Sequence, residues 1–451
     1  MRSPGAKVLH PLGGRPLLLL LVDTLLAVPR ARVVCVVGHD AELVRNALPP
    51  EVQTVTQWPQ RGTGDAVRVA RSRITGSRTL VVLPGDAPLI RRETIRALLD
   101  QHGRARALAT VLTAEPEDPA AYGRVVVGRD GQVQKIVEAV DADEETLRIR
   151  NINTGVYAFC PEALFSVIGQ IGTRNRKGEF YLTDSIELLS KRGRVVALRT
   201  DDPQEVAGIN DQADLARLEG TLQKRLRAGL LAGGVQIPHP QSVYLEPDVK
   251  VAPGARLLPG THLLGKTVVG PQALIGPDTL ISNSRIGARS RVWFSVVEDS
   301  IIDSDVRVGP YAHLRPKTHL ARGARIGNFV ETKAARIGPK ARVLHLSYVG
   351  DATVGEDANI GAGTITCNFD GFKKHPTRIA ARAFIGSNTA LVAPVSVGAR
   401  AVVGAGSVIT QNVPADGLAL TRAPQVMKRG WARKKRDLMK KRGVTGPRRR
   451  R

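Results

Sequence analysis

The second half of the chain carries an aliphatic residue at every sixth position. Three runs keep this spacing: Val251, Leu257, Leu263, Val269, Ile275 and Ile281; Ile302, Val308, Leu314, Leu320 and Ile326; and Ile379, Ile385, Leu391, Val397, Val403 and Ile409. Glycine often follows the aliphatic residue, as in Val269-Gly270 and Ile385-Gly386. A period of six fits neither an α-helix nor an ordinary hairpin and is typical of a parallel β-helix with three short faces per coil. We expect the aliphatic side chains to fill a prism whose coils wind left-handed.

One segment, residues 366–376, does not fit the six-residue phase. It mixes polar, aromatic and basic residues and follows the glycine-rich sequence of residues 360–363. Breaks in a solenoid become loops, and loops commonly carry function. A neutral surface insertion is the alternative, but the composition favours a role in ligand binding.

The first half alternates short aliphatic runs with segments of helical pattern. The expected strands cover residues 33–37, 53–56 and 79–83, and one core helix is expected to end before Pro29, with Leu18, Val22, Leu25 and Leu26 along one face. Such alternation predicts a parallel sheet covered by helices. Ligands of open α/β sheets bind at the carboxyl ends of the strands, so we expect the chemistry in the loops after Val37, Thr56 and Leu83.

Asp86 follows the last of these strands directly. A carboxylate in that place is suited to holding Mg²⁺, which prefers one or two carboxylates together with substrate phosphates. A turn residue that caps the next helix is the alternative interpretation. Further clusters lie at residues 57–66, 122–124, 136–138 and 151–155, and each of them alone is a weak signal.

Leucines at helical spacing separate the two halves. They are Leu215, Leu218, Leu222, Leu226 and Leu230, and Gly233-Gly234 closes the segment. The sequence therefore predicts an α/β domain over residues 1–212, a linker helix over 213–233, a β-helix over 234–427 and a basic tail over 428–451.

Composition excludes some classes of protein. The 451 residues are 42% hydrophobic, which rules out disorder throughout. Of the formal net charge of +25, +12 comes from the tail, which has 13 basic residues and Asp437. A nucleic-acid-binding protein is a remote alternative, because aromatic residues make up only 4% of the chain and the tail lacks interleaved stacking residues. The three cysteines lie far apart, which favours a reducing compartment and a cytoplasmic protein.

Several motifs stand in an order that carries a resemblance. They are Lys7-Val8-Leu9-His10, Gly62-Thr63-Gly64, Gly85-Asp86, Tyr122-Gly123-Arg124, Asn151-Ile152-Asn153-Thr154-Gly155, Gly178-Glu179-Phe180-Tyr181-Leu182-Thr183-Asp184, Gly208-Ile209-Asn210, Leu314-Arg315-Pro316, Gly327-Asn328-Phe329-Val330-Glu331 and Gly361-Ala362-Gly363-Thr364-Ile365-Thr366-Cys367-Asn368. Together they closely resemble the family of bifunctional N-acetylglucosamine-1-phosphate uridyltransferases and glucosamine-1-phosphate acetyltransferases. The resemblance implies a Rossmann-like nucleotidyltransferase domain, then a left-handed β-helix acetyltransferase domain.

For the first domain, the resemblance implies attack of the phosphate of N-acetylglucosamine-1-phosphate on the α-phosphate of UTP. The products are UDP-N-acetylglucosamine, a precursor of peptidoglycan, and pyrophosphate. The matching Mg²⁺ ligands are Asp86 and Asn210. The matching contacts to UTP and UDP-N-acetylglucosamine are Lys7 near the triphosphate, Gln57, Gly62 and Thr63 near the uracil, Gly123, Glu138 and Asn153 near the sugar, and Asn210.

For the second domain, the resemblance implies acetyl transfer from acetyl-CoA to the amine of glucosamine-1-phosphate, with His345 as the base. The matching sugar-phosphate contacts are Arg315, Lys333, Tyr348 and Asn359. The matching acetyl-CoA contacts are Ala362, Asn368, Phe369, Ser387, Ala405 and Arg422. The resemblance also implies a homotrimer with acetyl-CoA bound between neighbouring chains.

The largest departure from the family lies at the start of the chain. The family opens with a buried strand and a glycine-rich loop that cradles the nucleotide phosphates, and Met1 falls on the last residue of that loop. Without these parts we expect an inactive uridyltransferase site in a destabilised domain. Either the native chain begins earlier, which the presence of Lys7, Asp86 and Asn210 favours, or the protein is a monofunctional acetyltransferase. Smaller departures are Pro84, Asp65 and Phe369, the last of which stands where the family commonly has tyrosine.

Overall fold

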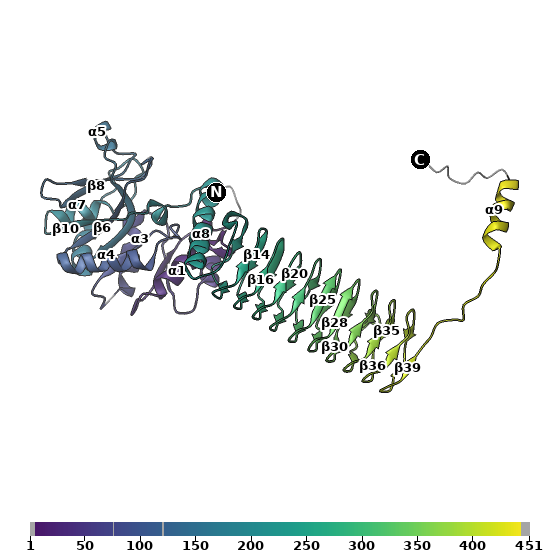
Figure 1. Cartoon of the computed structure of the whole chain (residues 1–451). Coiled ribbons are helices and arrows are strands. Elements are labelled where there is room, and N and C mark those ends of the chain that lie inside the picture. The colour runs from purple at the N-terminus through teal and green to yellow at the C-terminus, as the bar shows by residue number, and fades with distance from the viewer. Residues whose placement is uncertain (1–4, 75, 120, 443–451) are drawn as a thin grey trace. The chain divides into compact units, whose positions relative to one another are not determined.

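The computed structural model describes residues 5–74, 76–119 and 121–442 and divides the chain into two compact units. The first unit contains residues 1–232 and Tyr244–Pro247, and the second contains Gly233–Val243 and residues 248–451. The first unit mixes helices with strands, and the second is built from stacked coils (Figure 1).

The first unit alternates its helices and strands from one end to the other. Its strands are β1 (Pro11–Leu12), β2 (Arg15–Pro16), β3 (Val34–Val37), β4 (Gln53–Thr56), β5 (Leu80–Val82), β6 (Ala109–Ala114), β7 (Arg124–Val127), β8 (Val133–Val137), β9 (Ile152–Phe159), β10 (Val195–Arg199) and β11 (Tyr244–Leu245). Its α-helices are α1 (Leu17–Leu26), α2 (Ala41–Ala47), α3 (Thr63–Val69), α4 (Arg92–Ala105), α5 (Glu144–Leu147), α6 (Pro161–Val167), α7 (Asp184–Ser190) and α8 (Gln212–Ala232). Short 3₁₀ turns cover Lys7–Leu9, Ala70–Arg73, Ile168–Gln170 and Pro203–Val206.

The expected strands form at the expected places, but the expectation of one parallel sheet is wrong. Strands β3 and β4 pair in parallel as a sheet of their own. The larger sheet has the order β10-β6-β9-β7-β8, and β5 also pairs with β9. Its β10–β6 pair is parallel, whereas β9 runs antiparallel to β5, β6 and β7. The short connections around β7, β8 and β9 hold no long crossover helix, and a parallel pair needs such a crossover.

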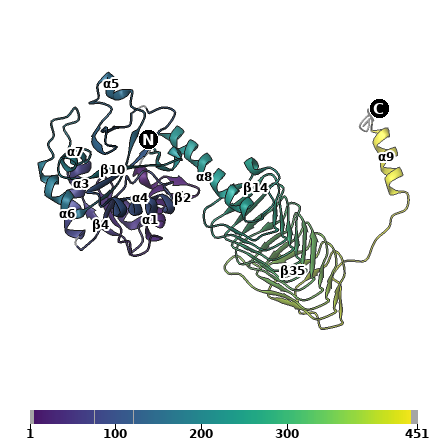
Figure 2. The ribbon, with the colours of Figure 1, turned by 60° about the vertical axis from the view of Figure 1, so that its left-hand side comes forward.

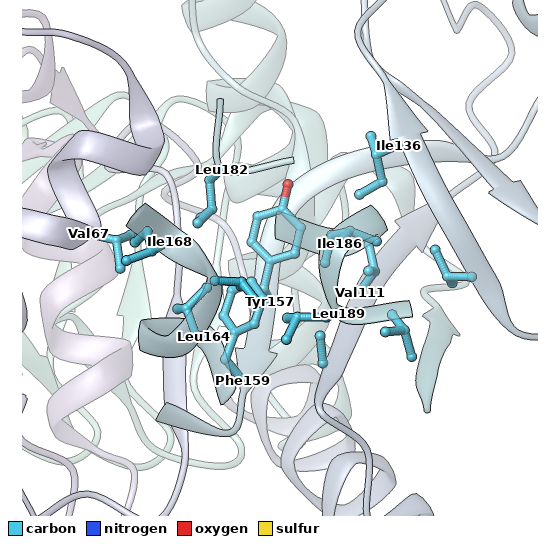
Figure 3. Close-up of a cluster of buried hydrophobic side chains, with 14 of the residues drawn as sticks. Val67, Val111, Ile136, Tyr157, Phe159, Leu164, Ile168, Leu182, Ile186 and Leu189 are labelled. Atoms are coloured by element: carbon cyan, nitrogen blue, oxygen red, sulfur yellow. The ribbon is translucent and has the colours of Figure 1, made fainter. Parts of the chain in front are cut away.

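The main core of the first unit packs α6 and α7 against this sheet. Phe159 is fully buried and contacts the Tyr157 ring, with the two centroids 5.4 Å apart. Figure 3 shows the Tyr157 ring between the aliphatic side chains of these helices, with its hydroxyl directed away from Phe159. The helix expected before Pro29 is α1, but Leu26 is exposed at its end, and Leu17 and Leu21 are buried in its place.

The second unit consists of three parallel sheets, as is typical of a left-handed β-helix (Figure 2). One sheet contains β14 (Thr261–Leu264), β17 (Thr279–Ser282), β20 (Val296–Glu298), β23 (His313–Leu314), β26 (Glu331–Lys333), β29 (Tyr348–Gly350), β32 (Ile365–Cys367), β35 (Ala390–Val392) and β38 (Val408–Ile409). A second contains β12 (Lys250–Val251), β15 (Val268–Val269), β18 (Arg285–Ile286), β21 (Ile301–Ile302), β24 (His319–Leu320), β27 (Arg336–Ile337), β30 (Ala352–Val354), β33 (Thr377–Ile379) and β36 (Val395–Val397). The third contains β13 (Arg256–Leu257), β16 (Leu274–Ile275), β19 (Arg291–Val292), β22 (Arg307–Val308), β25 (Arg325–Asn328), β28 (Arg342–His345), β31 (Asn359–Ile360), β34 (Phe384–Ile385), β37 (Val402–Val403) and β39 (Leu418–Ala419).

The six-residue pattern fills the prism as expected. All of its aliphatic residues are buried except Val251, which lies in the first coil and is partly exposed. Between the first and second runs the inward residues continue at a spacing of five in places, as from Ile281 to Ile286 and from Val297 to Ile302. The first run therefore ends where a coil is shortened, while the core continues through the prism.

Residues 368–376 leave the coils as a loop between β32 and β33, which confirms the expected break in the solenoid. The basic tail contains a helix, α9 (Trp431–Lys441), none of whose residues is buried. Among the described residues, no helix combines the length and the apolar character that crossing a membrane requires.

Candidate functional site

Both residues that were matched to metal ligands accept a hydrogen bond from the same cation. The Lys7 ammonium lies 2.6 Å from Asp86 Oδ2 and 3.1 Å from Asn210 Oδ1. The two oxygens therefore converge on one position, and that position already holds a positive charge. A carboxylate and an amide oxygen are also the kind of donors that Mg²⁺ takes, so the residues present fit that metal.

Helix α8 fixes the place of Asn210. The Asp211 carboxylate accepts from the Asp214 N–H at 2.8 Å, and the Asn210 N–H donates to Asp214 Oδ2 at 2.9 Å, so Asp211 caps the helix and Asn210 immediately precedes the cap. The preceding residue, Ile209, is fully buried and donates its N–H to the Asp86 carbonyl at 3.2 Å. Burial of the helix against the core thus brings Asn210 to Asp86, more than a hundred positions away in sequence.

The residues matched to the uracil also form one group. Gln57 Nε2 donates to the Gly62 carbonyl and to Asp65 Oδ2, both at 3.0 Å. Gly62 has a φ of +111°, and a Cβ there would lie 2.6 Å from the Phe180 carbonyl oxygen, so the turn requires glycine. Thr63 Oγ1 accepts from the Leu182 N–H at 3.0 Å. The departure at Asp65 is accommodated because its buried carboxylate pairs with Gln57 and with Arg68.

The residues matched to the sugar lie together beside that group. The Asn153 N–H donates to the Gly123 carbonyl at 2.8 Å, and a Cβ on Gly123 would lie 3.5 Å from Glu138 Oε2. Burial raises the pKa of Glu138, which still accepts a hydrogen bond from Thr183 Oγ1 at 3.2 Å. Burial also raises the pKa of Tyr157, whose hydroxyl is hydrogen-bonded to the Asn153 side chain.

A cavity of the first unit is lined by Asn210. Its volume is about 480 Å³, and its wall also includes Tyr122 and Ile152, the neighbours in sequence of Gly123 and Asn153. Pro84, two residues before Asp86, lies within 3.5 Å of the position of a Cβ on Gly155. The loop after β5, which carries Asp86, therefore lies beside β9, which carries Asn153.

The second unit gathers positive charge on the face of its β29-containing sheet. Arg315 donates to Glu331 Oε1 at 2.7 Å. The pKa of Lys333 is lowered, chiefly by the adjacent Lys374 ammonium and further by Arg315, because like charges disfavour the second proton. Sequence reasoning did not name Lys374, although it lies in the loop for which a ligand role was favoured. Three cations this close together are suited to a dianionic phosphate.

Tyr348 and Asn368 stand beside this positive cluster. Asn368 Nδ2 donates to Asp351 Oδ2 at 2.5 Å and to the Tyr348 hydroxyl at 3.3 Å, and it is nearly buried. Lys374 Nζ lies 3.9 Å from the same carboxylate of Asp351. Asp351 therefore ties the loop to the sugar-phosphate residues. Phe369, matched to acetyl-CoA, lies in this loop with its side chain exposed.

The remaining residues matched to acetyl-CoA stack on one corner of the prism. The Gly363 N–H donates to the His345 carbonyl, the Asn388 N–H to the Ala362 carbonyl and the Gly406 N–H to the Ser387 carbonyl, at 3.3, 2.7 and 2.8 Å. Arg422 Nη1 continues the series to the Ala405 carbonyl at 2.9 Å. We call His345, Ala362, Ser387, Ala405 and Arg422 the corner column. Successive coils are about 4.8 Å apart, so the corner column extends some 14 Å from His345 to Ala405.

His345 opens the corner column and is exposed at the end of β28. Its carbonyl accepts from Ser347 Oγ at 2.7 Å, which fixes the backbone at this corner. Tyr348 begins the next strand, three residues on, so the imidazole and Tyr348 flank the same corner. Asn359 lies on β31, in a different sheet from Lys333, and is paired with Arg342 in the preceding coil.

Comparison with known proteins agrees with this division into two kinds of domain. Residues 1–158 match the family of MobA-like NTP transferase domains, and residues 376–411 match the hexapeptide repeat of succinyl-transferase. An NTP transferase domain joined to a hexapeptide-repeat domain makes this chain a two-domain transferase.

Two relatives cover nearly the whole chain. The bifunctional protein GlmU of Fervidobacterium nodosum is 43% identical over 98% of this chain and 96% of its own length, and that of Heliobacterium modesticaldum is 45% identical over 96% and 95%. Among solved structures, a UDP-glucose pyrophosphorylase complexed with UDP-glucose is similar at 16% identity and a TM-score of 0.40, covering 49% of this chain and 90% of that one. From the full-length relatives, the chain belongs to the GlmU family of bifunctional proteins.

Proposed function

We propose that this protein makes UDP-N-acetylglucosamine by two consecutive transfers, one in each unit. The second unit acetylates the amine of glucosamine-1-phosphate with acetyl-CoA. The first unit joins the resulting N-acetylglucosamine-1-phosphate to UTP and releases pyrophosphate. The observation that carries the proposal is that residues matched by resemblance over the whole sequence form compact groups, each within one unit, whose charges suit these anionic substrates.

In the first unit, Lys7 lies where it can hold the triphosphate, and the turn at Gly62 and Thr63 offers backbone groups to the uracil. Glu138 and Asn153 offer acceptors and donors to the sugar hydroxyls. Mg²⁺ bound by Asp86 and Asn210 would neutralise charge on the phosphates. Phosphoryl transfer of this kind requires positioning and electrostatic stabilisation from the protein and no covalent nucleophile.

In the second unit, Arg315, Lys333 and Lys374 form the site for the sugar phosphate, with Tyr348 and Asn359 as further sugar contacts. His345 removes a proton from the attacking amine, whose nitrogen forms a bond to the thioester carbonyl carbon while the CoA thiolate departs. The corner column starts at this base and gives a track along which the extended acetyl-CoA lies. By family resemblance we propose a cytoplasmic homotrimer in which neighbouring chains share the acetyl-CoA site.

Two variants with crossed expectations test the proposal. His345→Ala should lower acetyl transfer by about a hundredfold or more and leave uridylyl transfer unchanged, because the base acts in one unit only. Asp86→Asn should lower uridylyl transfer and leave acetyl transfer unchanged. Both reactions are measured with Mg²⁺, by CoA release and by pyrophosphate release, on the 451-residue chain and on a chain extended at its start by the family's strand and glycine-rich loop. If either variant loses both activities or keeps both, the assignment is contradicted. If the unaltered extended chain shows acetyl transfer alone, the uridylyl half is contradicted.

A further inference from the structure

The segment of residues 178–184 contacts both the group matched to the uracil and the group matched to the sugar. The Phe180 N–H donates to the Arg61 carbonyl, and the Gly64 N–H donates to the Phe180 carbonyl, both at 2.8 Å. The Leu182 N–H then donates to Thr63 Oγ1 at 3.0 Å. The backbone of the segment is therefore fixed on the turn that we assign to the uracil.

Thr183 extends this contact to the sugar group. Its side chain is 4% exposed, and its hydroxyl donates to Glu138 Oε1 at 3.2 Å. Thr183 is also the N-cap residue of α7, a position where threonine commonly bonds to the first helical N–H groups, yet its side chain makes no such cap. The hydroxyl thus forms a hydrogen bond with the Glu138 carboxylate instead of capping the helix.

Glu138 needs that donor because its surroundings oppose its charge. Burial raises its pKa, and Asp141 raises it further, while Thr183 and then Lys177 act in the opposite direction. Asp184 on α7 is a second carboxyl whose pKa is raised by burial and by Glu138, and Tyr157 and Tyr181 face the same charge from β9 and from the segment. Among these neighbours, the Thr183 hydroxyl is a direct hydrogen-bond donor to Glu138.

We infer that Thr183 is a positioning residue for sugar recognition: it holds Glu138 ionised and oriented as an acceptor for the hydroxyls of N-acetylglucosamine-1-phosphate. The inference rests on the proposed function, because it takes Glu138 as a sugar contact. Thr183 acts through Glu138, so its removal should weaken sugar binding and leave UTP binding unaffected.

The test compares Thr183→Val, which keeps the shape and removes the hydroxyl, with Thr183→Ser, which restores it. Loss of a hydrogen bond to a charged group predicts an increase of about tenfold in KM for N-acetylglucosamine-1-phosphate. KM for UTP and the rate of acetyl transfer should not change, and Thr183→Ser should recover most of the loss. Thr110→Val is the matched control, since Thr110 is fully buried in the same unit and bonds to His102 instead.

The pH dependence gives a readout that a purely structural role would not alter. Without its donor, Glu138 keeps its proton to a higher pH, so the acid limb of kcat/KM for the sugar phosphate should move to higher pH in Thr183→Val. A ¹³C NMR titration of the Glu138 carboxyl should report the same upward movement directly, whether or not the enzyme turns over.

Any of the following results overturns the inference. Equal increases in both KM values, or a control that behaves like Thr183→Val, would mean general damage to the domain. An unmoved Glu138 titration would mean that the contact is unimportant. If Glu138→Gln raises KM for the sugar phosphate but Thr183→Val does not, the inference fails while the proposed function stands; if Glu138→Gln has no effect, the assigned sugar site itself is wrong.

Discussion

Replacing Phe159 by alanine should destabilise the first unit and spare the second. The ring is fully buried between the sheet and helices α6 and α7, and every member of its cluster belongs to the first unit. Deleting a buried phenylalanine side chain costs about 3–5 kcal/mol, partly from transfer and partly from the cavity that remains. For a unit of about 230 residues, a loss of about 4 kcal/mol corresponds to a decrease of roughly 8–16 °C in Tm.

The two proposed reactions make the measurement specific for each unit. After brief heating at graded temperatures, uridylyl transfer reports the first unit and acetyl transfer reports the second. We expect the midpoint for uridylyl transfer to fall in Phe159→Ala and that for acetyl transfer to stay within about 2 °C of the parent. Phe384→Ala is the control, because Phe384 lies half-exposed on the second unit and its loss should cost little. A parallel fall of both midpoints would refute the independence of the two cores. A decrease of less than about 3 °C in the midpoint for uridylyl transfer would refute the packing argument.

Two further predictions concern charge. Lys374→Met should raise KM for glucosamine-1-phosphate by about tenfold with little change in kcat, because one of three cations at the phosphate is lost. In the same variant, the pKa of Lys333 is no longer lowered by its neighbour, so glucose-1-phosphate, which has no amine, should bind up to a higher alkaline pH. Calorimetry from pH 8 to 10.5 measures the pH at which binding is half lost. A value that stays in place or moves down would contradict the prediction. Asp184→Asn should stabilise the first unit at neutral pH. Because the folded-state pKa of Asp184 is raised, the parent protein loses stability as pH rises through that value. The greater stability of the variant should therefore disappear below about pH 4, where the carboxyl is protonated in both the folded and the unfolded state. Greater stability that persists in acid would point to another cause.

Local patterns predicted the elements of this fold better than their arrangement. The strands at residues 33–37 and 53–56 appear almost as expected, because short segments rich in β-branched residues and bounded by turn residues favour strands. Their pairing could not be derived in the same way. The antiparallel course of β9 depends on which distant strands flank it, and the residues of Ile152–Phe159 suit a central strand in either direction.

The candidate sites divide in the same manner. Motif order across the whole chain predicts Asp86, Asn210, His345 and Arg315 as site residues, but not the neighbouring side chains that contact them. Lys374 lies in a loop without periodicity, and only its position beside Lys333 indicates a role. In the sequence, Thr183 resembles an ordinary N-cap residue of a helix. Only its hydrogen bond to Glu138 indicates a further role.

The sequence alone therefore determined the prism, because a repeat of six residues places the same side chain in the same local environment in every coil. It also predicts a boundary between the halves, since helical leucine spacing and paired glycines separate the two patterns. Only the tertiary structure decided which polar groups meet: Lys7 with Asp86 and Asn210, and Lys333 with Lys374. Such contacts join residues that are far apart in the chain, and their energy depends on burial and distance, which local patterns do not contain.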